Sequence, residues 1–355
     1  MLLADIPRDA WDDINGYMRA PREDAYMEAL AGALREAPGA AWRMEAENIP
    51  AQIIRDTFAD IGLWARRCKR QQGRWGLAPP ATDWLKNHLN CKIFRIGRFQ
   101  CMPRHMHGDW KARFYRRNAD GRVLALTAGD VEFRGDGQVN GTSGVYDDTD
   151  KFHGYYKETA AGGGTFAEGV AISPAGYAVN KIVRLDMSEW TPILNEGTPV
   201  FELHIPVDGD FLPETCQKTL SGMADFARGY MRAIARLTGV EGPFAAFTLC
   251  SWLLNAQLED MLPTSSNLIR HLRNYYLLPV FCGPDNELFW IFDGRKIDLD
   301  NLQPEDTQTS LQRKIIQFMR DGGKVRYNSG VIMLADLPEY GNDFYRNGFD
   351  SLNIK

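Results

Sequence analysis

Two short apolar runs in the middle of the chain, separated by a stretch of helical periodicity, dominate the hydrophobic pattern. Residues 199–206 and 244–254 are predicted strands, and the helix between them is expected to begin near Pro213. A strand, a helix and a strand form a βαβ unit, whose two strands lie parallel and close together. Ligands collect at the carboxyl ends of such strands. The polar residues that these two strands carry are Glu202, His204, Cys250 and Ser251.

The region before residue 91 has the period of amphipathic helices. Residues 22–36 and 49–71 each carry an apolar stripe, and residues 80–89 form a shorter helix. Pro38 and Gly39 are expected to end the first of these helices. No residue here has a chemical role that the sequence alone supports, so we expect a helical domain of residues 1–90.

From residue 91 the period falls to two, which is typical of half-buried strands. Residues 92–100, 111–117 and 122–127 are predicted strands of an antiparallel meander. Residues 140–164 are rich in Gly, Asp and Thr and are predicted to form a long mobile loop. Residues 188–194 are expected to be a short helical turn.

After the central unit, helices and strands alternate. One or two helices, broken at Pro263, are predicted over residues 255–274, and another helix over residues 309–320. Strands are predicted at residues 276–281, 288–292 and 331–334. The predicted domains are a helical domain (1–90), a mixed β-sheet domain flanked by helices (91–340) and a loosely docked tail (341–355).

Composition narrows the class of protein. The chain has 355 residues, 44% of them hydrophobic, and a net charge of −5, which argues against a nucleic-acid partner. No stretch approaches the roughly 20 apolar residues of a membrane span, and no signal peptide begins the sequence. The six cysteines follow no repeated spacing. We therefore expect a cytoplasmic protein with reduced thiols and no membrane partner.

The most informative candidate pair is Glu202 and His204. They are two residues apart on a predicted strand, so both side chains point to the same face. His204 could take a proton from an attacking amine while Glu202 orients its ring. The alternative is a buried pair that bridges strands for stability.

Other candidates each have a structural alternative. Cys250 could form a covalent acyl-enzyme or be a small buried hydrophobe, and Ser251 could donate a hydrogen bond to a substrate oxygen. The hydroxyls and Arg313 at the start of the helix near Thr309 could bind a carboxylate or phosphate, or merely cap the helix. The spacing of Cys101, His105 and His107 matches no established zinc pattern, so no metal is expected.

Several spaced motifs resemble a known family. They are Glu189-Trp190 with Leu194, residues 202–206, residues 250–254, Leu262-Pro263 with Ser266-Asn267, and residues 309–313 with Gly322-Gly323. In their order along the chain and in their residue identities, they resemble a bacterial family of acyltransferase-domain proteins with a helical N-terminal domain and a GNAT-like C-terminal domain. The resemblance covers about residues 90–335. It implies a combined α+β and α/β fold class.

The resemblance also implies a mode of cofactor binding. In GNAT enzymes an acyl thioester lies between the fourth and fifth strands, a strand N–H holds its carbonyl, and the next helix offers its N-terminus to the pyrophosphate. The corresponding cofactor-binding residues here are Ile205, Val207 and Gly209, with Ser310, Gln312 and Arg313 as further anion-binding candidates. Tyr276 corresponds to the tyrosine that often protonates the departing thiolate.

One stretch departs from the GNAT pattern. Residues 207–214 contain one glycine and three acids where the family has a glycine-rich turn. At ~5 Å and an effective dielectric of about 20, each repulsive pair with a diphosphate costs on the order of 3 kcal/mol.

The sequence therefore predicts an acyltransferase that moves an acyl group from a thioester to an amine or hydroxyl of a small acceptor, by direct attack with His204 as base. The donor is expected to be acyl-CoA or the acyl-phosphopantetheine of an acyl-carrier protein. The alternative is a non-catalytic GNAT-like ligand-binding module.

Overall fold

The computed structural model describes residues 5–20, 23–283 and 288–354. By contacts between Cα atoms the chain forms two compact units, each built from two chain segments. The first unit contains Met1–Arg104 and Pro199–Phe244, and the second contains His105–Thr198 and Ala245–Lys355. The division into domains at residues 90 and 340 stays a prediction. No helix within the described ranges is long and apolar enough to cross a membrane.

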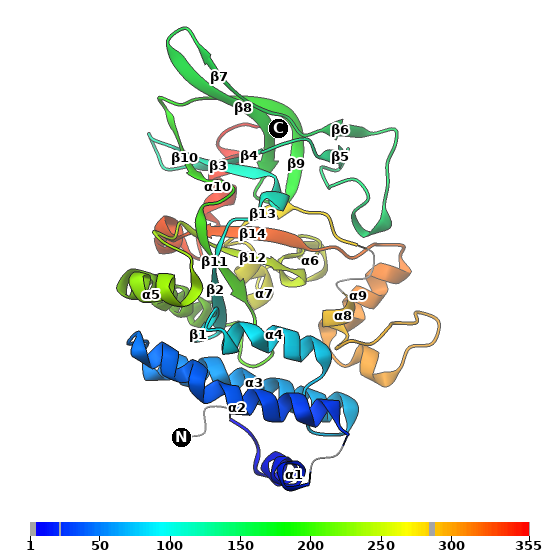
Figure 1. The fold of residues 1–355 in the computed structure, drawn as a ribbon. Helices are drawn as coiled ribbons and strands as arrows, with labels where there is room; N and C mark the ends of the chain where they lie inside the picture. Colours follow the sequence, from blue (N-terminus) through cyan, green and yellow to red (C-terminus); the bar gives the residue numbers. More distant parts are fainter. Residues whose placement is uncertain (1–4, 21–22, 284–287, 355) are drawn as a thin grey trace. The chain divides into compact units, whose positions relative to one another are not determined.

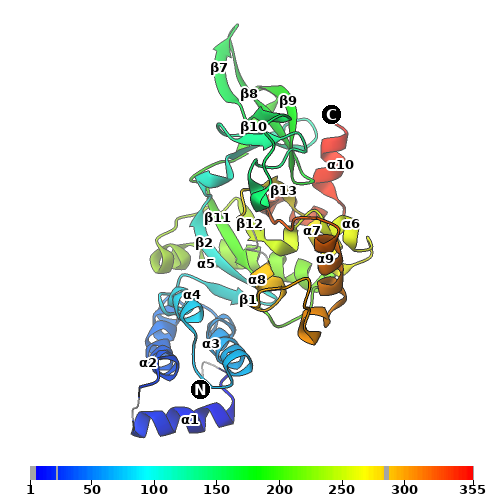
Figure 2. The ribbon, with the colours of Figure 1, turned by 90° about the vertical axis from the view of Figure 1, so that its right-hand side faces the viewer.

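The first unit begins with the predicted helical region. Its helices are α1 (Arg8–Arg19), α2 (Ala25–Ala46), α3 (Ala51–Gln72) and α4 (Pro79–Leu89) (Figure 1). The last three pack against one another (Figure 2). The prediction that Pro38 ends α2 was wrong. Proline removes one backbone N–H, but Ala37, Ala40 and Met44 are buried beyond the predicted end and keep the helix packed.

Three strands and a long helix complete the first unit. These elements are β1 (Phe94–Ile96), β2 (Phe99–His105), β11 (Pro199–His204) and α5 (Pro213–Thr238), and β2 lies between β1 and β11 in the sheet order. The predicted single strand 92–100 is instead the hairpin β1–β2. Gly97 turns it with φ +57°, and a Cβ at this position would lie 2.6 Å from Oγ1 of Thr219.

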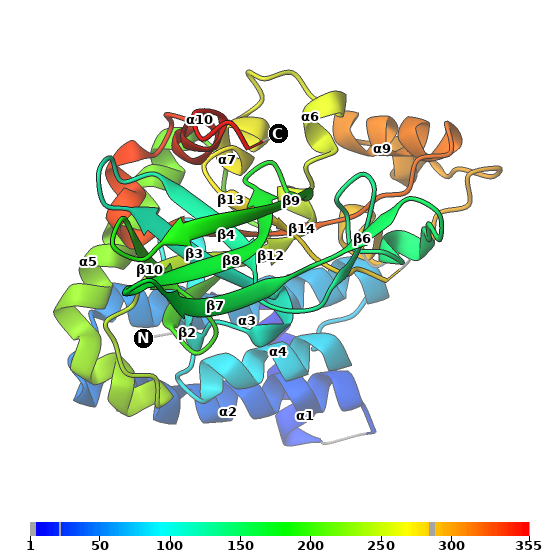
Figure 3. The same ribbon diagram turned by 90° about the horizontal axis from the view of Figure 1, so that it is seen from above.

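The second unit contains the expected antiparallel meander. Its main sheet has the order β10-β3-β4-β8-β7, with β9 also paired to β8 (Figure 3). The bounds are β3 (Ala112–Arg117), β4 (Val123–Thr127), β7 (Tyr156–Ala161), β8 (Gly164–Ser173), β9 (Tyr177–Asp186) and β10 (Trp190–Leu194). A small sheet pairs β5 (Glu132–Arg134) with β6 (Lys151–His153).

A further set of strands and several short helices belong to the same unit. Strands β12 (Ala246–Ser251) and β13 (Tyr276–Pro279) pair antiparallel with β14 (Asn328–Met333). The helices are α6 (Leu258–Met261), α7 (Asn267–Leu272), α8 (Leu288–Ile291), α9 (Ser310–Arg320) and α10 (Phe344–Asp350). The 3-10 turns are η1 (Gly108–Trp110), η2 (Thr142–Gly144), η3 (Trp252–Leu254), η4 (Pro304–Thr307) and η5 (Leu334–Glu339).

Three local predictions in this unit were wrong. Residues 140–164 are no long loop, because β6 and β7 form there and β7 pairs along β8. The predicted helical turn at 188–194 is strand β10, since Trp190 is buried and paired with β3. Residues 288–291 are helical rather than extended, and Ile291 packs in a core with α9.

The C-terminal segment is also more ordered than predicted. Instead of a loosely docked tail it contains α10, whose Phe349 is buried in the core of the meander. The hydroxyl of Tyr345 donates to Oδ2 of Asp336 at 3.1 Å and accepts from the N–H of Met333 at 2.8 Å. These contacts fix the segment on the second unit.

Candidate active site

The predicted pair lies where the sequence placed it, at the end of β11. Nε2 of His204 is 3.5 Å from Oε1 of Glu202, and about a quarter of each side chain is exposed (24% and 26%). Phe201 and Leu203, which alternate with the pair, are buried. The strand therefore presents a polar edge on one face and packs on the other.

Arg104 of β2 holds Glu202. Its Nε lies 2.9 Å from Oε2 of that carboxylate. Burial, and then the charges of Arg104 and His88, lower the pKa of His204 to about 3. Nε2 of His204 is itself buried and makes no hydrogen bond to a described residue. At neutral pH this residue is an uncharged imidazole.

The indole ring of Trp84 packs against the imidazole ring of His204. The rings of Trp84 and His204 meet edge to face, with centroids 4.7 Å apart and planes at 63°. Nε1 of Trp84 donates to Oδ2 of Asp60 at 2.9 Å, and Trp64 donates to the same oxygen at 3.2 Å. Because Asp60 fixes one edge of the Trp84 ring, it also fixes the surface that His204 contacts.

The carboxylate that binds Trp84 belongs to a buried group of polar side chains. Nε2 of His88 is 3.1 Å from Oδ2 of Asp60, and the amide nitrogen of Gln100 is 3.2 Å from the same imidazole nitrogen. His88 is fully buried and Asp60 is 3% exposed. Burial alone would raise the pKa of Asp60, but hydrogen bonds from His88, Gln100 and Trp84 hold it below its ordinary value. The carboxylate is therefore a charged anchor inside the unit.

Sequence reasoning missed Asp60, His88 and Trp84, although a signal was present. Asp60 lies three residues after Thr57 and four before Trp64, so it shares the buried face of α3. His88 follows the buried Leu85 by three residues on α4. A charged or imidazole side chain on an apolar stripe needs a partner, and that requirement identifies both positions.

The acidic turn after β11 is less repulsive than the sequence suggested. Nη2 of Arg95 binds Oδ2 of Asp208 at 2.8 Å. Arg98 donates to the carbonyls of Pro206 at 2.8 Å and of Asp210 at 2.7 Å. One of the three acids thus has a cation beside it, and a buried arginine supports the turn from inside.

The cofactor-binding candidates of this turn differ in exposure. Ile205 is half-buried and Val207 is exposed. Gly209 has φ +85°, which favours glycine, and a Cβ there would lie only 3.1 Å from Cδ of Arg98. Helix α5 follows with Leu212 as its N-cap and no side-chain cap on its first turn.

The remaining catalytic candidates lie in the second unit. Cys250 is exposed, unlike the buried hydrophobe of the alternative interpretation. Oγ of Ser251 accepts from the N–H of Leu253 at 3.2 Å and caps η3. Tyr276 is fully buried, which raises its pKa, and its hydroxyl bonds the backbone of Ile172 and Ala125. This geometry is that of a structural core tyrosine and does not support a role in protonating the departing thiolate.

The start of α9 is occupied by its own capping groups. Thr309 and Gln312 form a reciprocal capping box, and Gln312 also donates to the carbonyl of Ile291 at 3.2 Å. Nη1 of Arg313 donates to the carbonyl of Thr307 at 2.6 Å, while Ser310 is exposed. This arrangement favours capping over anion binding. Among the described residues, no group of three or more His, Cys, Asp or Glu is placed to hold a metal ion.

Comparison with solved structures finds the same fold in acyltransferases. The chain matches an acyltransferase in complex with decanoyl-CoA and teicoplanin at TM-score 0.54 and 16% identity, covering 92% of this chain and 76% of that chain. It matches an acyltransferase mutant in complex with octanoyl-CoA at TM-score 0.53 and 17% identity, covering 91% and 76%. No curated protein sequence matches the chain.

Family models divide the chain between them. Residues 1–91 match the N-acyltransferase N-terminal domain, and residues 93–332 match the GNAT-like C-terminal domain. The predicted family, fold class and enzyme class are thereby confirmed. The chain belongs to the N-acyltransferase family that joins a helical N-terminal domain to a GNAT-like C-terminal domain.

Proposed function

We propose that the chain transfers an acyl group from acyl-CoA to an amine or hydroxyl of a small acceptor, with His204 taking the proton of the attacking atom. The observation that carries this proposal is the position of His204 on the polar edge of β11, where about a quarter of its side chain is exposed beside a carboxylate that Arg104 holds in place. Its lowered pKa keeps the ring neutral but makes it a weak base, so it takes the proton only as the new bond to the acceptor forms. A neutral imidazole has a lone pair available for a proton.

The proposed reaction is a direct displacement. The acceptor nitrogen or oxygen attacks the thioester carbonyl, forming the new bond to carbon, and its proton passes to His204. The tetrahedral intermediate collapses, the carbon–sulfur bond breaks, and the CoA thiolate leaves. The imidazolium returns the proton to this thiolate, so CoA-SH is released and His204 is neutral again. A strand N–H near Ile205 is proposed to polarise the carbonyl.

Two arginines of the β1–β2 hairpin, which contact the turn after β11, support acyl-CoA as the donor. Arg95 pairs with Asp208 and Arg98 binds the backbone on both sides of Gly209, so the acids there oppose a diphosphate less than their number suggests. The structural relatives that hold octanoyl-CoA and decanoyl-CoA support the same donor class. Ser251 and Tyr276 have no part in this proposal because their oxygens bind backbone groups.

The test combines binding and turnover on the full chain. Acetyl-, octanoyl- and decanoyl-CoA are compared by thermal shift, because a ligand at 100 times its dissociation constant adds about 2.7 kcal/mol to the free energy of unfolding. Release of CoA-SH is then followed with a panel of amines, amino sugars and glycopeptides. We expect stabilisation by at least one acyl-CoA and turnover that falls by about 10²–10⁴ in His204→Gln.

Two results would contradict the proposal. Turnover in His204→Gln at the wild-type rate would show that His204 is not the base. If no acyl-CoA binds but an acylated carrier protein supports turnover, the donor is the carrier protein and not acyl-CoA. Cys250→Ala serves as the control, because direct attack needs no nucleophilic cysteine.

A further inference from the structure

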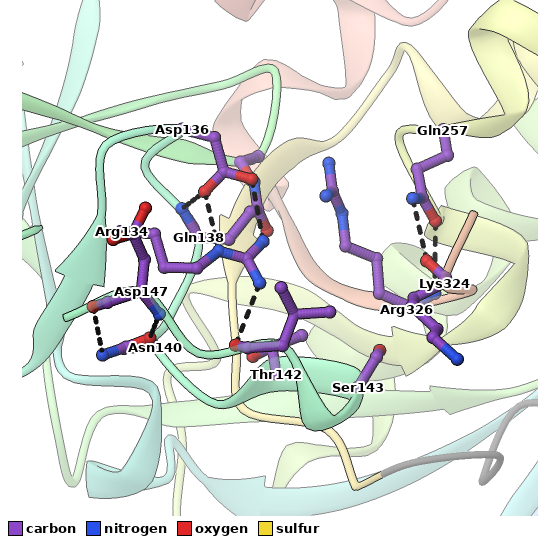
Figure 4. Close-up of polar contacts among 12 residues, drawn as sticks. Arg134, Asp136, Gln138, Asn140, Thr142, Ser143, Asp147, Gln257, Lys324 and Arg326 are labelled. Carbon is purple, nitrogen blue, oxygen red and sulfur yellow. Dashed lines mark hydrogen bonds and ion pairs between the residues drawn. The ribbon is translucent and has the colours of Figure 1, made fainter. Parts of the chain in front are cut away.

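A polar cluster of the second unit has no part in the proposed reaction. It contains Arg134 and Asp136, at the end of β5 and in the turn that follows, and Arg326, just before β14 (Figure 4). The two arginines come from segments far apart in sequence and act electrostatically on each other. They differ in the hydrogen-bond partners of their guanidinium groups.

Arg134 is fully paired. Its Nε and Nη2 lie 3.2 and 2.8 Å from the two carboxylate oxygens of Asp136, and its Nη1 donates to the carbonyl of Val145 at 3.1 Å. Asp136 also accepts from the N–H of Gln138 at 3.0 Å. Burial alone would raise the pKa of Asp136, but Arg134 and this N–H hold it below its ordinary value. The positive charge of Arg134 is therefore matched by one carboxylate.

Arg326 has a fixed backbone and an unpaired side chain. Its N–H donates to Oε1 of Gln257 at 3.2 Å, and the Nε2 of that glutamine donates to the carbonyl of Lys324 at 3.0 Å. Ser143 donates to the carbonyl of Val325 at 2.6 Å. The guanidinium forms no hydrogen bond or ion pair with any residue in the described part of the chain, and its Nε is buried.

The charge balance around Arg326 is incomplete. Asp136 attracts it and Arg134 repels it, and Asp260 adds a weaker attraction. Because Asp136 is hydrogen-bonded to Arg134, the guanidinium of Arg326 lacks a hydrogen-bonded counterion among the described residues. An arginine stays protonated even when burial lowers its pKa. A partly buried cation without a partner is costly, so its retention calls for a ligand.

We propose that the guanidinium of Arg326 binds the carboxylate group of a small molecule. The planar fork of an arginine matches the two oxygens of a carboxylate, and beside Asp136 and Asp260 a monoanion meets less repulsion than a dianion. The side chain of Asp136 is 52% exposed and Arg326 is half-buried, so the cluster reaches the surface. This site is independent of the proposed acyl transfer, and its test needs no turnover.

The experiment follows the Nε–H resonance of Arg326 by NMR in the full chain. Sodium acetate replaces sodium chloride at constant ionic strength, and acetamide serves as the uncharged isostere. We expect a saturable shift of this resonance with acetate, half complete at a concentration on the order of millimolar, and none with acetamide. Arg326→Gln identifies the resonance by removing it.

Thermal unfolding gives a second readout that does not depend on that assignment. Acetate is expected to raise the Tm of the wild type relative to chloride, but not that of Arg326→Gln. Arg228→Gln is the matched control, because it removes an arginine whose side chain is 69% exposed and paired with Asp225. It should keep the full acetate response.

Three outcomes would overturn the proposal. They are the absence of a saturable shift with acetate, an equal acetate response in Arg326→Gln, and tighter binding of inorganic phosphate than of acetate. The last would assign the site to a dianion rather than a carboxylate.

Discussion

Trp84 connects the helical region to the candidate base: its ring lies 4.7 Å from that of His204, while its N–H binds Asp60 at 2.9 Å. Asp60, on α3, accepts from Trp84 on α4 and thereby sets the surface against which the strand histidine rests. We therefore propose that these two helices position His204 for the proposed proton transfer.

Substitutions of two tryptophans distinguish an effect on the position of His204 from an effect on the stability of the fold. Trp84 and Trp64 both donate to Oδ2 of Asp60, but only Trp84 has a ring contact with His204 among the described residues. Replacing either by Phe removes one partly buried hydrogen bond, which costs about 1 kcal/mol of unfolding free energy in each variant. We expect kcat to fall about tenfold in Trp84→Phe, because a displaced catalytic group loses its alignment. Trp64→Phe should keep nearly full kcat.

Urea unfolding and steady-state kinetics on both variants check this prediction. Equal losses of kcat in the two variants would assign Trp84 a purely structural role. A loss of kcat without any change in the His204 environment, seen in its NMR resonances, would point to a different cause.

His204 also predicts how stability depends on pH. Its pKa is about 3 in the folded chain and about 6.5 in an unfolded one. Between these two pKa values the unfolded state is protonated at His204 and the folded state is not. The contribution of His204 to the free energy of unfolding is therefore complete above pH 6.5 and is lost as the pH falls toward 3. Urea unfolding at pH 7.5 and pH 5 should show a smaller acid loss in His204→Gln than in the wild type. Parallel curves for the two proteins would contradict the assigned pKa.

Arg104 offers a direct handle on that pKa. Burial is the largest cause of the lowered value, and the charge of Arg104 is the next. Arg104→Gln should raise the pKa of His204 toward 6.5 without reaching it, because the burial remains. An NMR titration of the His204 ring, assigned with His204→Gln, measures the change. An unchanged pKa would show that Glu202 screens the arginine completely.

The sequence predicted the strand that carries the site because its signal is local. Glu202 and His204 stand two apart among apolar residues, so alternation alone places them together on one face. The family resemblance added the fold, which the alternation of elements suggested but could not specify.

The supporting residues could not be predicted as a group, because their contacts join distant parts of the chain. Asp60, Trp84 and Arg104 precede His204 by 100 or more residues, and no local period records which helix faces which strand. Local errors have a similar origin. Trp190 lies in a segment that reads as a helical turn but pairs with β3, so tertiary pairing overrode local propensity.

Acyl-CoA affinity should depend on Arg95 through its ion pair with Asp208. Without the arginine, the carboxylate at the turn has no cation at 2.8 Å and repels the diphosphate. We expect Arg95→Gln to raise the Kd for acyl-CoA about tenfold, equivalent to about 1.4 kcal/mol, with kcat little changed. Calorimetric titration at two salt concentrations measures it, and the difference should shrink at high salt.

The double variant Arg95→Gln, Asp208→Asn decides between repulsion and direct contact. If Arg95 acts by neutralising Asp208, removing both charges should restore most of the wild-type affinity, and the double-mutant cycle should show strong coupling. If Arg95 binds the diphosphate itself, the double variant should remain as weak as the single one. The second result would also mean that the acids of this turn do not oppose CoA binding. Arg95 would then stand in for the glycine-rich turn that the sequence lacks.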